Sequence, residues 1–157
     1  MKITLLVIGK TVNGYLKTGE DDYLKRLKFY GDVDYMVVNS IKNAKSMSEA
    51  QQKEEEGKLF LTKIMSSDFC VLLDEKGKMY TSEEFSGFLN SKAVSGLKNL
   101  VFVIGGPYGF SDAIYRRADL KLSLSSMTFS HQMVRMIFLE QLYRAFTILR
   151  NEPYHHK

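Results

Sequence analysis

Four short runs of β-branched and aliphatic residues limit what this chain can fold into. The four runs are Ile3–Ile8, Val33–Val38, Phe69–Leu73 and Leu100–Ile104. Stretches with helical spacing lie between them. Three of the runs are almost continuously apolar, which is typical of strands buried on both faces, because a half-exposed strand alternates apolar and polar residues. Buried strands that alternate with helices predict an α/β fold with a mostly parallel sheet flanked by helices.

Three of the intervening segments have helical features. Ser46 and Glu49 have the spacing of a capping box and predict a helix that begins near Ser46. Thr81 and Glu84 predict a second capped helix, and a third helix is expected over about Asp21–Tyr30.

The last third of the chain departs from this rhythm. We expect a glycine-rich turn over 105–109, a short helix over 112–118 and an alternating strand over 120–124. A hydroxyl-rich loop over 125–130 and a long final helix over 131–150 should follow. The apolar residues of the final helix cover more than a one-sided stripe, so this helix needs a second partner, either its own chain or a second subunit. No repeat or linker divides the chain, so residues 1–157 are expected to form a single domain.

Composition sets limits on partners and location. The 22 Lys and Arg residues exceed the 18 Asp and Glu residues and leave a net charge of +4, which fits an anionic partner without identifying it. Cys70 is the single cysteine, so no internal disulfide forms and a reducing cytoplasm is expected. No apolar run approaches the roughly 20 residues that cross a bilayer. We therefore expect a cytoplasmic protein with no membrane association.

Two segments at strand ends are candidates for ligand binding. Gly105–Gly109 follows a buried strand, where open α/β sheets bind ligands, but its spacing matches neither a dinucleotide fingerprint nor a phosphate loop. A sharp strand exit explains this motif equally well. Asp74 and Glu75 end another buried strand, and since adjacent residues of an extended segment point in opposite directions, we interpret them as solvated turn residues.

The final helix and the tail carry further candidates. His131 precedes Arg135 by four residues, a spacing that by itself indicates an ordinary ion pair or polar contact. We expect His131 to be neutral, because a helix N-terminus disfavours a positive charge. Two histidines, His155 and His156, follow Tyr154, but no cysteine or carboxylate cluster completes a tetrahedral set, so we expect no metal.

The amino-acid sequences of several of these segments resemble those of a known family. The resemblance rests on the N-terminal strand and on Leu72-Leu73-Asp74, Val103–Gly109, Leu122–Arg135, Glu140–Ala145 and Pro153-Tyr154-His155. Together they are similar to the bacterial methyltransferases that act on N3 of a pseudouridine in large-subunit ribosomal RNA, which belong to the SPOUT, or α/β-knot, class. Ser130 departs from the family pattern, in which a proline often precedes the histidine.

The resemblance implies a SPOUT fold with a trefoil knot near the C-terminus and a homodimer whose active site combines residues of both subunits. It also implies that S-adenosylmethionine (SAM) is bound by three loops, at Leu73, at Gly105, and at Leu124, Ser125, Ser126, Met127, Thr128 and Phe129. The substrate would be 23S rRNA within the ribosome.

For catalysis, the resemblance and the unusual tail point to His155, which with Tyr154 acts on the imide proton of N3 or positions the base. Arg144, with Arg135 as a second candidate, would stabilise negative charge on the carbonyls. RNA contacts would come from basic side chains such as Lys10, Lys17, Lys25, Arg26, Arg116 and Arg117. A non-catalytic RNA-binding or ribosome-assembly module is the main alternative, and a nicotinamide-dependent oxidoreductase is a third.

Overall fold

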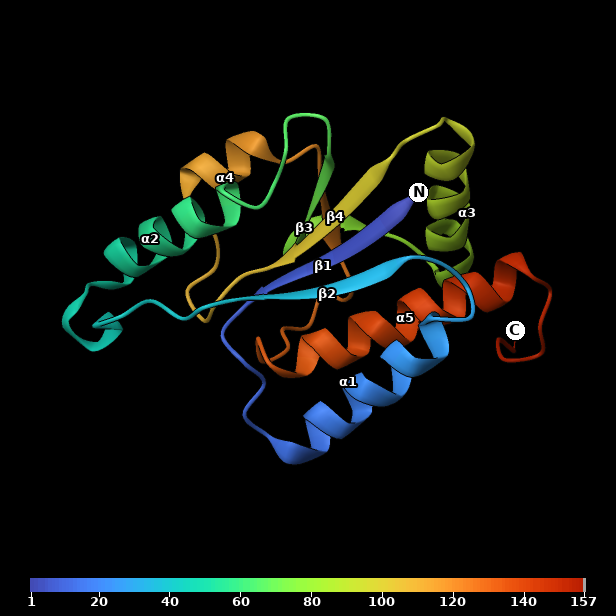
Figure 1. Ribbon diagram of the computed structural model, residues 1–157, viewed down its shortest axis with the longest axis horizontal. Coiled ribbons are helices and arrows are strands. Elements are labelled where there is room, and N and C mark those ends of the chain that lie inside the picture. Colours follow the sequence, from blue (N-terminus) through green and yellow to red (C-terminus); the bar gives the residue numbers. More distant parts are fainter. Residues whose placement is uncertain (157) are drawn as a thin grey trace.

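A computed structural model describes residues 1–156, and its strands form one parallel five-stranded sheet (Figure 1). Lys157, the last residue of the expected domain and of the tail, lies outside this range. The strands are β1 (Lys2–Ile8), β2 (Val33–Val38), β3 (Phe69–Met79), β4 (Asn99–Ile104) and β5 (Leu120–Ser123), in the order β2-β1-β4-β3-β5. The helices are α1 (Gly14–Leu27), α2 (Glu49–Leu61), α3 (Ser82–Val94), α4 (Asp112–Arg117) and α5 (Met133–Leu149). The prediction of an α/β fold with a parallel sheet is confirmed.

Helices cover both faces of the sheet (Figure 1). Alternate residues of β1 belong to two apolar clusters: Leu5 and Val7 pack on the side of α1, α3 and α5, while Leu6 and Ile8 pack on the side of α2 and α4. Burial of both strand faces explains why the runs that form the inner strands lack polar alternation.

Two helix starts differ from the predictions. Ser46 does not cap α2 but ends a short 3₁₀ turn, and the capping box is formed by Ser48 with Gln51. Both serines have a suitable residue three positions later, so the pattern alone does not separate them. The first helix begins at Gly14, seven residues before the expected Asp21, whereas the predicted box of Thr81 and Glu84 caps α3.

Strand β3 continues beyond its expected end through a bulge. Leu73 and Lys78 both pair with Leu122 of β5, so the four residues between them are looped out of the ladder. Gly77 ends this loop, and a Cβ there would lie 2.5 Å from the backbone carbonyl carbon of Lys121. A glycine therefore allows the bulge to close tightly against β5.

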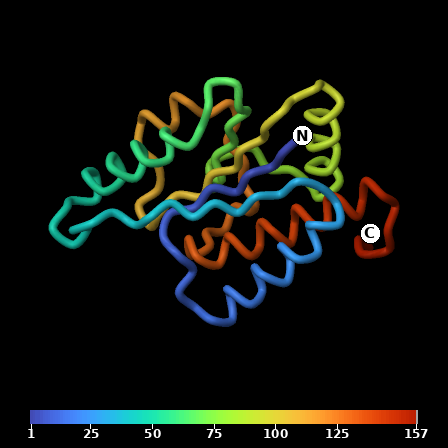
Figure 2. The backbone as a smooth tube through the Cα atoms, in the orientation of Figure 1, coloured from blue at the N-terminus to red at the C-terminus, as the bar shows by residue number. Residues whose placement is uncertain are grey.

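Helix α5 has neighbours from its own chain on two sides. It packs against α1 and α3, and the chain trace in Figure 2 shows α1 and α5 running side by side. Part of its second apolar face is thus covered within the chain. Met133 and Leu149, near its two ends, remain 38% and 40% exposed.

Candidate active site

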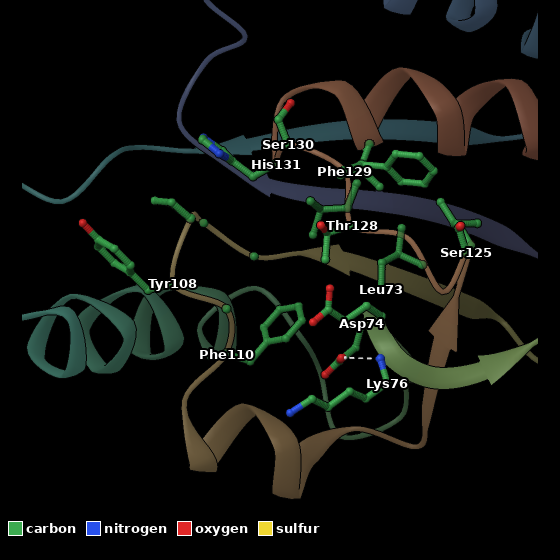
Figure 3. A pocket seen from close by; sticks show the side chains of 18 of the residues that line it. Leu73, Asp74, Lys76, Tyr108, Phe110, Ser125, Thr128, Phe129, Ser130 and His131 are labelled. Carbon is green, nitrogen blue, oxygen red and sulfur yellow. Dashed lines mark hydrogen bonds between the residues drawn. The ribbon is translucent and has the colours of Figure 1, made fainter.

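A cavity of about 650 Å³ lies where β3, β4 and β5 end. Three segments line it: the β3 bulge, the glycine turn after β4, and the loop from β5 into α5. Figure 3 shows Leu73, Tyr108, Thr128 and His131 around this space. A concave site of this volume, formed by loops at the carboxyl ends of parallel strands, is where open α/β sheets bind small molecules.

The glycine turn after β4 is closed by its own backbone. Gly109 N–H donates to the carbonyl of Gly106 over 3.2 Å, and Gly109 has a φ of +84°, which favours glycine. The motif is therefore a sharp strand exit and a cavity wall at once, so the two interpretations offered by the sequence are compatible.

Hydroxyl groups shape the loop between β5 and α5. Ser125 Oγ accepts from the Met127 N–H at 3.0 Å, and Ser123 donates to the Ser125 carbonyl at 2.8 Å. Ser130 Oγ accepts from the Met133 N–H at 3.1 Å and satisfies the first turn of α5. The serine that departs from the family pattern therefore accepts a hydrogen bond from the first residue of α5, although the N-cap position itself is occupied by Gln132.

The structure brings most of the predicted cofactor residues together at one cavity. Its lining includes Leu73, Gly105, Leu124, Ser125, Met127, Thr128 and Phe129. Ser126 belongs to the same loop but is not among the lining residues.

Asp74 is more than the solvated turn residue expected from the sequence. It is partly buried, lines the cavity and accepts from the Tyr115 hydroxyl at 2.6 Å and from the Lys76 N–H at 2.9 Å. Burial and the neighbouring carboxylate raise the pKa of Tyr115, so its hydroxyl stays a donor at neutral pH. No local pattern pointed to Tyr115, because this contact spans 41 positions.

His131 lines the same cavity from the start of the α5 segment. Burial, and to a smaller extent the charge of Arg135, lowers its pKa, which agrees with the expected neutral imidazole. The physical reason differs from the predicted one, because α5 begins two residues later, at Met133.

Arg135, the second candidate for charge stabilisation, has a different role. It is fully buried, and its guanidinium donates to the carbonyls of Ile8 and Gly9 and to the Thr11 hydroxyl. These contacts hold the segment after β1 against α5. Arg135 therefore does not reach a base from this position: its side chain is fully buried, and both of its Nη groups donate inside the fold, although its Nε has no partner within the described residues.

The predicted catalytic residues of the tail also lie together. Arg144 Nη1 is 3.2 Å from His155 Nδ1, and the guanidinium lies 4.9 Å from the ring centre of Tyr154. Glu140 accepts from both Arg144, at 2.6 Å, and the Tyr154 hydroxyl, at 2.9 Å. Burial and hydrogen bonds to Tyr23 and Glu140 raise the pKa of Tyr154, so Tyr154 is a proton donor and not a base near pH 7.

The hydrogen bonds of His155 define its tautomer. Arginine has no acceptor, so Arg144 must donate to Nδ1, and the ring proton is then on Nε2, which lies 3.1 Å from a Glu83 carboxylate oxygen. Glu83 was not among the predicted site residues, because it lies in the first turn of α3, 72 positions from His155, and no local pattern connects the two.

Within one chain, these tail residues do not face the cavity. Val134 lines the cavity, and Arg144 lies ten residues further along α5, which corresponds to about 15 Å of helix. In Figure 1 the C-terminus lies beyond the far end of α5. The predicted catalytic and cofactor residues thus form two separate groups in one subunit.

Several of the predicted RNA-contacting residues are engaged within the chain. Arg117 donates to the carbonyls of Met65 and Asp68 and pairs with Asp119, so it stabilises the fold. Lys17 pairs with Asp21, and Arg26 pairs with Asp22 over an aromatic face. Within residues 1–156 there is no group of three or more potential metal-ligating side chains and no helix long and apolar enough to span a membrane.

The parallel sheet and the loop-formed cavity at its carboxyl edge define an α/β protein of the small-molecule-binding type. A family model described as "predicted SPOUT methyltransferase" matches residues 1–155. This chain belongs to the SPOUT methyltransferase family.

Individual relatives agree with this family. The chain is 60% identical, over the full length of both proteins, to a protein of Flavobacterium johnsoniae named ribosomal RNA large subunit methyltransferase H. Its fold is similar to a probable methyltransferase from Bordetella pertussis, with a TM-score of 0.55, 10% identity, and 92% and 96% of the two chains covered. A methyltransferase from Legionella pneumophila in complex with SAM has a TM-score of 0.50 at 12% identity, with 92% and 66% covered.

Proposed function

We propose that this chain is a SAM-dependent methyltransferase that methylates N3 of a pseudouridine in 23S rRNA. The observation that carries the proposal is the cavity at Leu73, Gly105 and the 124–129 loop, in a full-length relative of a ribosomal RNA large subunit methyltransferase.

The cavity suits SAM. Its glycine turn and serine-rich loop offer backbone groups to the edge of an adenine, and Leu73, Leu124 and Phe129 offer apolar contacts to its faces. Asp74, at the same wall, suits a ribose hydroxyl or an ammonium group. When bound, SAM supplies a methyl group on a positively charged sulfur.

The chain's own residues must orient the target base and remove the proton from N3. We assign the proton to His155 Nδ1, which becomes available when the base displaces Arg144 from it, while Glu83 holds the Nε2–H. Arg144 then stabilises the charge that develops on the carbonyl oxygens, and the Tyr154 hydroxyl, which remains protonated and donates to Glu140, keeps Glu140 in place against Arg144.

Because the tail and the cavity lie at opposite ends of α5, we propose a homodimer in which the tail of one subunit completes the cavity of the other. The partly exposed apolar residues at the ends of α5 fit a subunit contact. This arrangement brings together the two groups that are about 15 Å apart in one chain.

The remaining parts of the proposal concern the chain as a whole. The five strands form one sheet, so we propose one domain that acts in the cytoplasm on assembled ribosomes, where the RNA surface supplements a net charge of only +4. We also propose that the C-terminal segment is knotted. Strand β5 is at the sheet edge beside β3, whereas α5 packs on α1 and α3, so the connecting loop crosses from the sheet edge to the face that these helices cover.

The experiment is to incubate the protein and labelled SAM with ribosomes from a strain without this activity and to map the labelled base by mass spectrometry. Label on N3 of one pseudouridine is expected. SAM binding in calorimetry that is lost in Gly105→Leu separates this proposal from a non-catalytic RNA-binding module, which predicts neither SAM binding nor transfer.

A further inference from the structure

A second cavity, of about 410 Å³, adjoins the candidate active site. The two cavities share Gly106, Pro107 and His131. Apolar side chains such as Ile8 and Ile41 line part of the second cavity, and α2 contributes Glu56. The function proposed above assigns no role to this cavity.

Glu56 is a buried carboxylate that lacks donors. Its residue is only 4% exposed, and within the described residues its Oε1 has no hydrogen-bond partner. Its Oε2 has one long contact, 3.5 Å from the amide nitrogen of Gln52. Burial raises the pKa of Glu56, although Gln52 opposes this shift. A buried carboxylate in this state is costly unless a molecule that enters the cavity donates to it.

The carboxylate lies against the boundary between the two cavities. A Cβ on Gly106 would lie 2.7 Å from Glu56 Oε2 and 2.8 Å from Oε1, so only a glycine leaves room for it. Gly106 directly follows Gly105, which lines the proposed cofactor cavity. An acceptor without a donor is thus placed at the boundary between the second cavity and the proposed cofactor cavity.

Pseudouridine carries a group that matches this acceptor. Its sugar is attached to C5, so its N1 carries a hydrogen, whereas N1 of uridine is bonded to the sugar and donates nothing. N1 and N3 flank the same carbonyl carbon, so one wall can accept from N1–H while N3 faces the methyl group. The apolar residues of the second cavity suit the faces of a pyrimidine ring.

We propose that Glu56 accepts the hydrogen bond from N1–H of the target pseudouridine and thereby makes the enzyme prefer pseudouridine to uridine. This inference rests on the proposed function. Glu56 is a specificity-determining residue in this account, and it takes no proton from N3. A site built around a hydrogen bond rejects the analogue that lacks the donor, because its buried acceptor is then unpaired.

The test uses two populations of ribosomes, one from cells without the methyltransferase and one from cells that also lack the pseudouridine synthase for the target position. We expect wild-type protein to show about 10- to 100-fold higher kcat/KM on the pseudouridine ribosomes, the range for a hydrogen bond to a charged group. Glu56→Met fills the same space without an acceptor, and its preference is expected to fall close to one through loss of activity on pseudouridine. Glu56→Gln keeps a neutral acceptor and is expected to retain part of the preference.

Glu54→Ala is the matched control, because it removes a carboxylate from the exposed side of the same helix. It should leave the preference unchanged. Melting temperature and SAM affinity are measured for each variant, so that a folding defect is seen separately.

Three outcomes overturn the inference. A Glu56→Met protein that keeps the wild-type preference shows that only water meets the carboxylate. An equal loss on both ribosome populations, in Glu56→Met and Glu56→Gln alike, indicates a general catalytic or structural role. In these first two outcomes the wild-type protein is still active on the pseudouridine ribosomes, so the proposed function stands. In the third outcome the wild-type protein is inactive on both ribosome populations, which refutes the proposed function and the inference together.

Discussion

Replacement of Arg135 by methionine should destabilise the protein strongly. The guanidinium donates to the Ile8 carbonyl at 2.6 Å, the Gly9 carbonyl at 2.8 Å and the Thr11 hydroxyl at 3.2 Å, and its residue is fully buried. Thr11 in turn donates to Glu20 at 2.9 Å, which is also fully buried, so the two charges are linked through one hydroxyl. Arg135→Met leaves two backbone carbonyls and the Thr11 hydroxyl without these donors, and at about 1–3 kcal/mol for each unsatisfied group the expected loss is about 3–5 kcal/mol. This is a large share of the roughly 5–15 kcal/mol that stabilise a typical domain.

Urea unfolding measures the free energy of unfolding for wild type, Arg135→Met, Glu20→Gln and the double variant. Because Glu20→Gln removes the charge that Arg135→Met leaves uncompensated, the double variant should lose about 1–3 kcal/mol less than the sum of the single losses. Additive losses, or a loss below about 1 kcal/mol for Arg135→Met, would refute the reasoning. Unchanged stability with a large loss of turnover would return Arg135 to a catalytic role.

Three further predictions concern the cavity walls. Gly77→Ala places a methyl group against the β5 backbone, so it should weaken SAM binding by about tenfold or more in calorimetry and lower the melting temperature. Gly87→Ala, which adds a methyl group in open space on α3, should change neither SAM binding nor the melting temperature. His131 should titrate below about 6.5 in an NMR pH series, because burial and the charge of Arg135 favour its neutral form. Arg135→Met should raise this pKa. A pKa of His131 above that of a free histidine would contradict the effect of burial and of Arg135. Burial raises the pKa of Glu56, so the folded state favours the protonated carboxyl. This contribution to stability is complete below the pKa of the unfolded chain, about 4.3, and is lost as the pH rises through the pKa of the folded state. In urea titrations Glu56→Gln should therefore become more stable relative to wild type as the pH rises above about 4.3, and a difference that is independent of pH would contradict this.

The strands and the cavity loops were predictable because their signals are local. Apolar runs define strands; Leu73 ends one such run and Gly105 directly follows another, so their meeting at one sheet edge follows from parallel topology. The hydroxyl-rich loop could be assigned to the same cavity only through the family resemblance.

The contacts that the sequence did not reveal are distant or ambiguous. Glu83 meets His155 across 72 positions, and Tyr115 meets Asp74 across 41, so no periodicity links them. Arg135 was a second candidate for catalysis through the family resemblance, yet in the fold its side chain is buried and its Nη groups donate to the backbone after β1. The sequence does not single out Glu56 among three consecutive glutamates, because burial of one of the three depends on how α2 packs.

The composite active site is tested most directly by mixing two inactive variants. Gly105→Leu is designed to block the proposed cofactor cavity and His155→Ala to remove the proposed proton acceptor, and each variant must first be shown to fold and to lack activity on ribosomes. If the tail of one subunit serves the cavity of the other, a mixed dimer holds one intact site, and random exchange should restore about one quarter of wild-type activity. If cavity and tail act within one chain, no mixed dimer holds an intact site, and a mixture that stays inactive after confirmed subunit exchange contradicts the account.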